Sequence, residues 1–231
     1  MTICNEIMEE IKSRLDEILA LRTKFVSKDD RSYVSEGDLL VQSIVLDVIK
    51  LKLPSHVLIS EELAPFDDCR WDPQGSYVVL DPIDGTENFV SGLKEWGVGI
   101  SIFDQGIHEE SCIYLPELDE FLTSGMSVNK FKSRIIGLSS SLEKTDLLSL
   151  PESDYEYRII GCSMYNTLSA VKGSFIVFEN VKGVNCWDVL PGLNLALEHG
   201  SQVFVDDMPY KGKILFPTKK YKIRISNQEK I

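Results

Sequence analysis

The chain is organised around the stretch LDPIDGTENF at residues 80–89. The apolar run before it predicts a strand that ends at Asp81. Proline fixes its own φ and biases the preceding residue towards extended geometry, so a turn at Pro82 can direct Asp81 and Asp84 to one point. The Ile83 carbonyl would add a third oxygen. Hard divalent cations such as Mg²⁺ prefer oxygen ligands, so this turn is a candidate metal site.

The same turn carries a feature that suits an anion. Gly85 and Thr86 begin a short helical stretch, and backbone N–H groups at a helix start bind phosphate well. One loop would therefore supply metal ligands and a phosphate cradle side by side. Asp-Pro and Asp-Gly are also common in ordinary turns, so the run alone leaves a purely structural role open.

Further acidic residues stand where predicted elements begin or end. Glu61 and Glu62 follow a predicted strand, and Asp188 follows Trp187 at the start of a predicted helix. Strand ends and helix starts are where α/β proteins gather site residues. The simpler interpretations are a solvated acidic pair and an ordinary helix N-cap.

The composition restricts the classes of function. Of the 231 residues, 43% are hydrophobic and 26% are charged, which is typical of a globular chain and excludes a disordered one. The formal net charge of −12 argues against nucleic-acid binding through a basic face. A small anionic substrate would need bound cations to offset this charge, which agrees with a metal site.

Cysteine and histidine usage argues against a disulfide framework and against zinc. The five cysteines form no Cys-x-x-Cys motif, and the three histidines are scattered. The N-terminus lacks the basic start and apolar core of a secretory signal, and no apolar run is long enough to cross a bilayer. The expected location is the cytoplasm, with no membrane partner.

Hydrophobic periodicity predicts two parts that pack as one compact unit, an α+β part at residues 1–130 and an α/β part at residues 131–231. Helices are predicted at residues 7–21, from an N-cap at Asp38 to before Pro54, and at residues 142–150, 165–171 and 187–199. Strands are predicted at residues 56–60, 76–80, 98–103, 112–114, 120–123, 134–137, 157–160, 174–178 and 201–205. Residues 27–37 are expected to form a loop.

Together these motifs resemble the inositol monophosphatase superfamily, which includes 3′(2′),5′-bisphosphate nucleotidases and fructose-1,6-bisphosphatases. Residues 80–89 are similar to its Asp-Pro-Ile/Leu-Asp-Gly-Thr signature, Ser60–Glu62 to its upstream Glu-Glu, and Cys186–Asp188 to its downstream Trp-Asp. Lys28–Asp38, with Tyr33 in place of a proline, is similar to an element of the nucleotidase branch. The resemblance covers nearly the whole chain and implies a layered α-β-α-β-α sandwich.

The resemblance implies a metal centre with two or three Mg²⁺ ions. The implied ligands are Glu61, Asp81, Asp84, Asp188 and the Ile83 carbonyl, with Glu62 as an outer or third-metal ligand. The implied activity is hydrolysis of a phosphate monoester by metal-activated water, with inhibition by lithium.

The resemblance also implies roles around that centre. Asp38 and Thr86 would orient and deprotonate the attacking water, with Glu61 as a further catalytic residue. Gly85 and Thr86 would bind the phosphate. The residues that match a substrate-pocket stretch of the family are Gly161, Cys162 and Ser163.

The substrate stays open between several alternatives. Tyr165 replaces a lysine of the nucleotidases, Asn180 stands near the place of a basic residue, and Val181 replaces a sugar-binding glutamate of inositol monophosphatases. We expect a small phosphorylated polyol or sugar such as inositol 1-phosphate, with adenosine 3′,5′-bisphosphate as the alternative substrate. A non-catalytic binding or regulatory protein on the same fold is the alternative of another class. The assembly that the resemblance implies is a homodimer.

Overall fold

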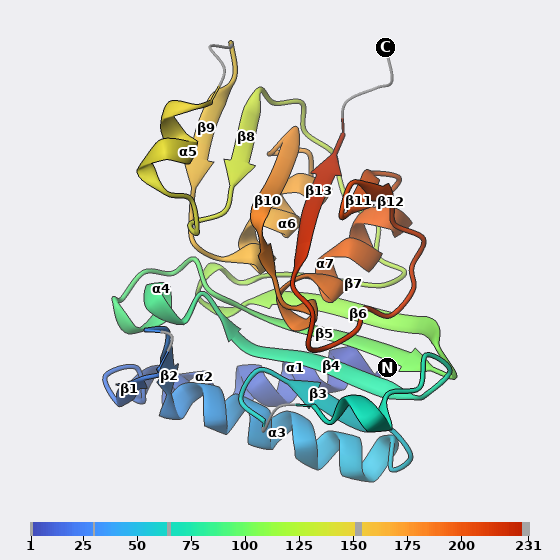
Figure 1. Cartoon of the computed structure of the whole chain (residues 1–231). Helices are drawn as coiled ribbons and strands as arrows, with labels where there is room; N and C mark the ends of the chain where they lie inside the picture. The colour runs from blue at the N-terminus through green and yellow to red at the C-terminus, as the bar shows by residue number, and fades with distance from the viewer. Residues whose placement is uncertain (1, 30, 64–65, 151–153, 228–231) are drawn as a thin grey trace.

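The computed structural model describes residues 2–29, 31–63, 66–150 and 154–227. Two main β-sheets lie one above the other, with helices below the first sheet and between the two sheets (Figure 1). This arrangement confirms the predicted layered α/β fold. Asp30, part of the Lys28–Asp38 element quoted above, lies outside the described residues.

The first sheet carries the predicted metal turn. Its strands, in spatial order, are β3 (Val57–Ser60), β4 (Tyr77–Asp84), β5 (Gly97–Asp104), β6 (Ile107–Leu115) and β7 (Glu120–Thr123). β3 and β4 run parallel, whereas the later neighbours are antiparallel. Every residue of β4 is buried, because apolar clusters cover both faces of the strand.

Helices cover the lower face of the first sheet (Figure 1). They are α1 (Ile3–Ser13), α2 (Leu15–Ala20) and α3 (Glu36–Lys52). Ile7 and Ile11 of α1 recur at helical spacing, and both are fully buried in one cluster with Val78 and Leu80 of β4. Burial of this apolar stripe fixes the helices on the sheet.

The second sheet lies above the first. Its strands, in spatial order, are β12 (Met208–Pro209), β11 (Gln202–Val205), β13 (Tyr221–Ser226), β10 (Val177–Val184), β8 (Ile135–Leu138) and β9 (Glu156–Ile159). β10, β8 and β9 run parallel, as the predicted alternation of strands and helices requires. β13 pairs antiparallel with both β10 and β11.

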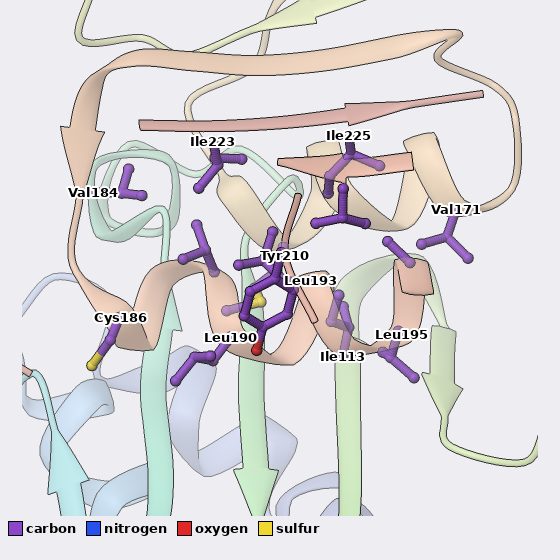
Figure 2. Packing of buried hydrophobic residues seen from close by; sticks show 14 of the residues in the cluster. Ile113, Val171, Val184, Cys186, Leu190, Leu193, Leu195, Tyr210, Ile223 and Ile225 are labelled. Atoms are coloured by element: carbon purple, nitrogen blue, oxygen red, sulfur yellow. The ribbon is translucent and has the colours of Figure 1, made fainter. Parts of the chain in front are cut away.

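Two helices fill the space between the sheets, α6 (Ser163–Val171) and α7 (Cys186–Glu198). Leu190 and Leu193 of α7 belong to one buried cluster with Ile223 and Ile225 of the second sheet and Ile113 of the first (Figure 2). A helix that is apolar on several sides is typical of a buried layer. This layer joins the two sheets through one continuous core.

The remaining elements are short. They are the hairpin of β1 (Phe25–Ser27) and β2 (Tyr33–Ser35), α4 (Thr86–Val90), α5 (Lys144–Leu148), and two 3₁₀ turns at Asp68–Arg70 and Pro116–Leu118. All five cysteines are free thiols. Among the described residues, no helix has the length and hydrophobicity to cross a membrane.

The structure corrects two helix predictions. The helix predicted at residues 7–21 is two helices, separated at Arg14, whose φ of −112° departs from helical geometry. Asp38 is not the N-cap of α3. That position is held by Ser35, whose hydroxyl accepts hydrogen bonds from the N–H groups of Gly37 and Asp38, while the Asp38 carboxylate accepts one from the Ser35 N–H.

Several strand predictions are also corrected. β4 does not end at Asp81 but continues to Asp84, and β10 begins at Val177 rather than Ser174 and continues to Val184. The expected loop at residues 27–37 contains β2 and the first turn of α3, and β13 was not predicted. These differences arise where pairing with another strand, rather than local hydrophobicity, defines the element.

The packing of α6 against α7 can be tested at Gly192. A Cβ at this position would lie 2.2 Å from Thr167 Cγ2 and 2.7 Å from Thr167 Cβ. We predict that Gly192→Ala lowers the free energy of unfolding by about 1–3 kcal/mol, despite the better helix propensity of alanine. Urea unfolding measures the change. Thr167→Ala in the same protein should restore part of the loss, and a Gly192→Ala protein as stable as the parent would contradict this packing.

Candidate metal centre

A bulge in β4 places Asp81 and Asp84 on one face of the sheet. Residues three apart in a regular strand point to opposite faces. In the pairing with β5, however, Asp81 stands opposite Gly99 and Asp84 opposite Gly97, so β4 contains one extra residue between them. Both carboxylates therefore point to the face covered by α6 and α7, where a Cβ at Gly99 would meet Met164 of α6.

Glu61 and Asp188 join Asp81 from other elements. β3 and β4 are parallel with Ser60 opposite Leu80, so the residues that follow these two lie at the same edge of the sheet. Asp188 comes from the first turn of α7, where its Oδ2 accepts a hydrogen bond of 2.7 Å from the Asn185 N–H. One ligand oxygen each from Glu61, Asp81 and Asp188 lies within 4.8 Å of the others.

The electrostatics of this trio call for a cation. Asp81 is 0% exposed, and neither of its carboxylate oxygens has a hydrogen-bond partner among the described residues. Burial, followed by the neighbouring carboxylates, raises the pKa of Asp81 well above its ordinary value. The same causes, burial first and then Glu61, raise the pKa of Asp188 to about 8. The donor set of three carboxylates is the kind that Mg²⁺ prefers.

Asp84 is held beside the trio by the start of α6. Its Oδ2 accepts hydrogen bonds from the Cys162 thiol, at 2.9 Å, and from the Met164 N–H. Burial raises the pKa of Asp84 to about 6, although these hydrogen bonds oppose the shift. Burial likewise raises the pKa of the Cys162 thiol, which stays protonated as the donor. Asp84 and Asp188 line the same pocket.

Lys28 supplies a fixed positive charge at the outer side of the centre. Its ammonium lies 2.9 Å from Glu61 Oε1 and 2.7 Å from Glu62 Oε1. Burial alone would lower the pKa of Lys28, but the two carboxylates outweigh this and raise that pKa above its ordinary value. Glu62 therefore neighbours the centre through Lys28, while Glu61 belongs to the trio itself.

The predicted pair of Asp38 and Thr86 is not joined in the structure. The Thr86 hydroxyl donates to the Ile83 carbonyl at 3.0 Å, and Asp38 Oδ1 has no hydrogen-bond partner among the described residues. Asp38 is fully buried, and this burial raises its pKa to about 7 despite two hydrogen bonds from Ser35. The Ile83 carbonyl, a predicted metal ligand, thus accepts a hydrogen bond from Thr86, which uses one of its two lone pairs.

A polar pocket of about 220 Å³ opens beside Asp84 and Asp188. The three residues that the family resemblance placed in a substrate pocket, Gly161, Cys162 and Ser163, line it. Asn180, which the family resemblance placed near a substrate-binding position, also lines it. The lining residues that were not foreseen are Ser139, Ser140, Ser141, Asn166, Gly183, Val184, Asn185 and Lys220. Among these residues only the run Ser139–Ser141 stands out in the sequence, because the others come from segments that are far apart along the chain.

Two of the three positions that depart from the family's substrate signatures lie outside the pocket. Tyr165 points away from the pocket and lines a larger hollow of about 760 Å³ with Phe121 and Phe175, which lacks the site carboxylates. Val181 is also outside the pocket, and its side chain is exposed. Asn180, by contrast, is 2% exposed and donates to Ser139 Oγ at 2.9 Å inside the pocket.

Comparison with known families agrees with this geometry. The sequence profile of the inositol monophosphatase family matches residues 1–229. The chain belongs to this family. Solved structures of the family have the same fold. An IMPase/NADP phosphatase complexed with Mg²⁺ and phosphate superposes with a TM-score of 0.81 at 20% identity, covering 98% of this chain and 89% of that one.

Two other family structures superpose over most of their length. For the IMPase of Thermotoga maritima the TM-score is 0.72 at 22% identity, with 93% of this chain and 92% of that one covered. For a staphylococcal inositol monophosphatase described as a LiCl-soaked inhibitory complex the TM-score is 0.82 at 20% identity, with 98% and 88% covered. At these identities the likeness establishes the fold.

Two relatives that are similar in sequence are named Nus factor SuhB. The Nus factor SuhB of Pasteurella multocida is 26% identical over 209 residues, which cover 79% of this chain and 74% of that protein. The Nus factor SuhB of Escherichia coli K12 is 29% identical over 111 residues, which cover 46% of this chain and only 40% of that protein.

The repulsion within the trio leads to a prediction for Asp188→Asn. At pH 9, above the pKa of about 8 of Asp188, removing one like charge should raise the melting temperature in EDTA, and loss of a ligand should abolish most of the rise that Mg²⁺ produces. Calorimetry with EDTA and with Mg²⁺ measures both effects. Asp47→Asn, at an exposed position of α3, removes the same charge elsewhere and should leave the Mg²⁺ response intact. An Asp188→Asn protein with an unchanged Mg²⁺ response would remove Asp188 from the centre.

A second prediction concerns pH. The pKa values of about 6, 7 and 8 for Asp84, Asp38 and Asp188 lie above the ordinary value near 4, so the metal-free folded state keeps protons that the unfolded state has lost. Stability in EDTA should therefore fall as pH rises from about 5 to 8. Mg²⁺ must displace these protons, so the stabilisation by Mg²⁺ should grow over the same range. A melting temperature in EDTA that rises over this range would contradict the raised pKa values.

Proposed function

We propose that this chain is a Mg²⁺-dependent phosphomonoesterase that hydrolyses a small phosphorylated polyol or sugar, with inositol 1-phosphate as the type substrate. The observation that carries the proposal is the buried Asp81 carboxylate, which has no hydrogen-bond partner among the described residues. One of its oxygens lies within 4.8 Å of oxygens of Glu61 and Asp188, and Asp188 lines a polar pocket. A site of this kind is built to hold a cation next to a small polar molecule.

The proposal assigns the metal to the carboxylates and the proton to Asp38. When bound by Glu61, Asp81 and Asp188, with Asp84 as a further ligand, Mg²⁺ would offset the phosphate charge and lower the pKa of the attacking water. The water oxygen forms the new bond to phosphorus as the bond to the alcohol oxygen breaks, and the departing alcohol oxygen takes a proton from solvent water. Asp38 takes the proton of that water, since Asp38 Oδ1 is an acceptor without a partner among the described residues. For a relay through Thr86, the Thr86 hydroxyl would have to turn from the Ile83 carbonyl towards Asp38.

Neighbouring groups would position the phosphate and its alcohol. Gly85 has a φ of +82° and, with Thr86, begins α4 directly after Asp84, so the backbone N–H groups of both residues are proposed to bind the phosphate. Hydroxyl and amide side chains line the pocket that would receive the alcohol. These groups suit a polyol, whose hydroxyls both donate and accept hydrogen bonds.

The size of the pocket favours a polyol or sugar over a nucleotide. Pockets for drug-sized ligands usually measure about 300–1,000 Å³, whereas this one measures about 220 Å³, which suits a single ring better than a nucleoside. Tyr165 also stands where the nucleotidase pattern has a lysine, and it lines a different hollow. Adenosine 3′,5′-bisphosphate is therefore the second candidate substrate.

The competing class of function is binding without catalysis. The relatives named Nus factor SuhB favour this alternative, because their name describes a factor and not an enzyme. A buried Asp81 carboxylate beside the partly exposed carboxylates of Glu61 and Asp188 is costly without a cation, however, and a purely binding role gives no reason to keep it. This supports the enzyme over the binding protein.

Phosphate release in Mg²⁺ tests the proposal. The substrates are inositol 1-phosphate, adenosine 3′,5′-bisphosphate and fructose 1,6-bisphosphate, and we expect the highest kcat/KM with a polyol or sugar phosphate. Li⁺ should inhibit, in keeping with the LiCl-soaked inhibitory complex of the staphylococcal relative. No release from any substrate, together with no effect of Mg²⁺ on the melting temperature, would leave the binding alternative.

Asp38→Asn separates proton transfer from metal binding. We predict that kcat falls by about 10²–10⁴, the usual contribution of a general base, while the rise in melting temperature with Mg²⁺ is retained. Asp38 accepts two hydrogen bonds from Ser35, and an asparagine oxygen can still accept them, so the helix start should stay intact. Unchanged turnover in this variant would exclude Asp38 as the base.

A further inference from the structure

The pocket beside the metal centre has a positive rim on one side. Among its described lining residues, Lys220 is the only basic one. It stands just before β13, and Gly183 of β10 lets it come close, because a Cβ at Gly183 would lie 3.3 Å from Lys220 Cβ. Asp84 and Asp188 line the same pocket, so one cavity contains both the metal carboxylates and a lysine.

The Lys220 ammonium differs from its neighbours in having no partner among the described residues. Lys219 pairs with Asp206 at 2.7 Å, and Lys182 pairs with Asp146 at 2.7 Å. Lys220 is exposed, lines the pocket and has no partner among the described residues, so its ammonium is available to an anion from outside.

Hydroxyl groups stand around the same pocket. Ser139 Oγ accepts hydrogen bonds from Asn180 Nδ2 at 2.9 Å and from the Ser141 N–H at 3.2 Å, and it lies 2.7 Å from Ser141 Oγ. Ser140 and Ser141 are exposed lining residues. A cation with neighbouring hydroxyl donors is the usual receptor for a phosphate or a carboxylate.

We propose that Lys220, with the Ser139–Ser141 hydroxyls, determines specificity by binding a second acidic group on the leaving alcohol. The inference rests on the proposed phosphatase activity and extends it. The scissile phosphate belongs at the carboxylate side of the pocket, and a second phosphate or a carboxylate belongs at Lys220. The favoured substrates are then sugar or polyol phosphates that carry a further acidic group.

Matched substrates test this assignment. Glucitol 6-phosphate has no second acid, 6-phosphogluconate adds a carboxylate to the same carbon chain, and fructose 1,6-bisphosphate adds a phosphate. For the parent protein we expect kcat/KM to be about ten-fold higher for at least one of the doubly acidic substrates. Lys220→Gln should remove that preference, with activity on glucitol 6-phosphate within about two-fold of the parent.

Lys219→Gln is the control, because this lysine is adjacent in sequence and outside the pocket-lining set. It should keep the preference. Which doubly acidic substrate loses activity in Lys220→Gln identifies the second group as phosphate or carboxylate. Equal losses on all three substrates, or no loss on any, would overturn the assignment.

Binding measurements separate this inference from the proposed activity. In the Asp38→Asn background, calorimetry gives the Kd of each ligand in Mg²⁺ without rapid turnover, and Lys220→Gln should weaken only the doubly acidic ligands, by about ten-fold. A protein that binds them in this way but releases no phosphate would contradict the phosphatase and retain the role of Lys220. A protein that releases phosphate but binds all three equally would contradict only the role of Lys220.

Discussion

A single extra residue in β4 is the constraint on which the site depends. Without the bulge between Asp81 and Asp84, their side chains would point to opposite faces, and one carboxylate would enter an apolar cluster. With it, both point to the α6 and α7 layer. That layer brings Asp188 from α7 and the Cys162 donor from the start of α6 to the same place. The sheet register therefore fixes the geometry of the centre.

Repulsion between the carboxylates of the metal centre opposes its assembly. Asp81 has no donor among the described residues, and only Lys28, on the outer side, supplies a full positive charge by direct contact with Glu61. The apolar clusters on both faces of the first sheet must hold these carboxylates in place. Local stability is thus lowered where function is located, and a bound cation would restore it.

The sequence was most informative where chemistry and local geometry coincide. Asp81, Asp84, Glu61 and Asp188 could be foreseen because acidic residues at strand ends and helix starts leave a short-range signal. The sequence did not distinguish Ser35 from Asp38 as the N-cap of α3, because both residue types are common N-caps and the capping box of this helix uses both side chains. The bulge was missed because register is defined by the partner strand.

Most of the pocket lining beyond Gly161, Cys162 and Ser163 could not be predicted, for a related reason. The lining comes from the ends of β8 and β10, the start of α6 and the segment before β13, which meet only in the folded chain. The orientation of Tyr165 likewise depends on how α6 packs between the two sheets.

The metal carboxylates Glu61, Asp81 and Asp188 are also far apart in the sequence, and this separation has a kinetic consequence. Contacts so distant in sequence form late in folding, so a cation held by all three should slow unfolding far more than it speeds folding.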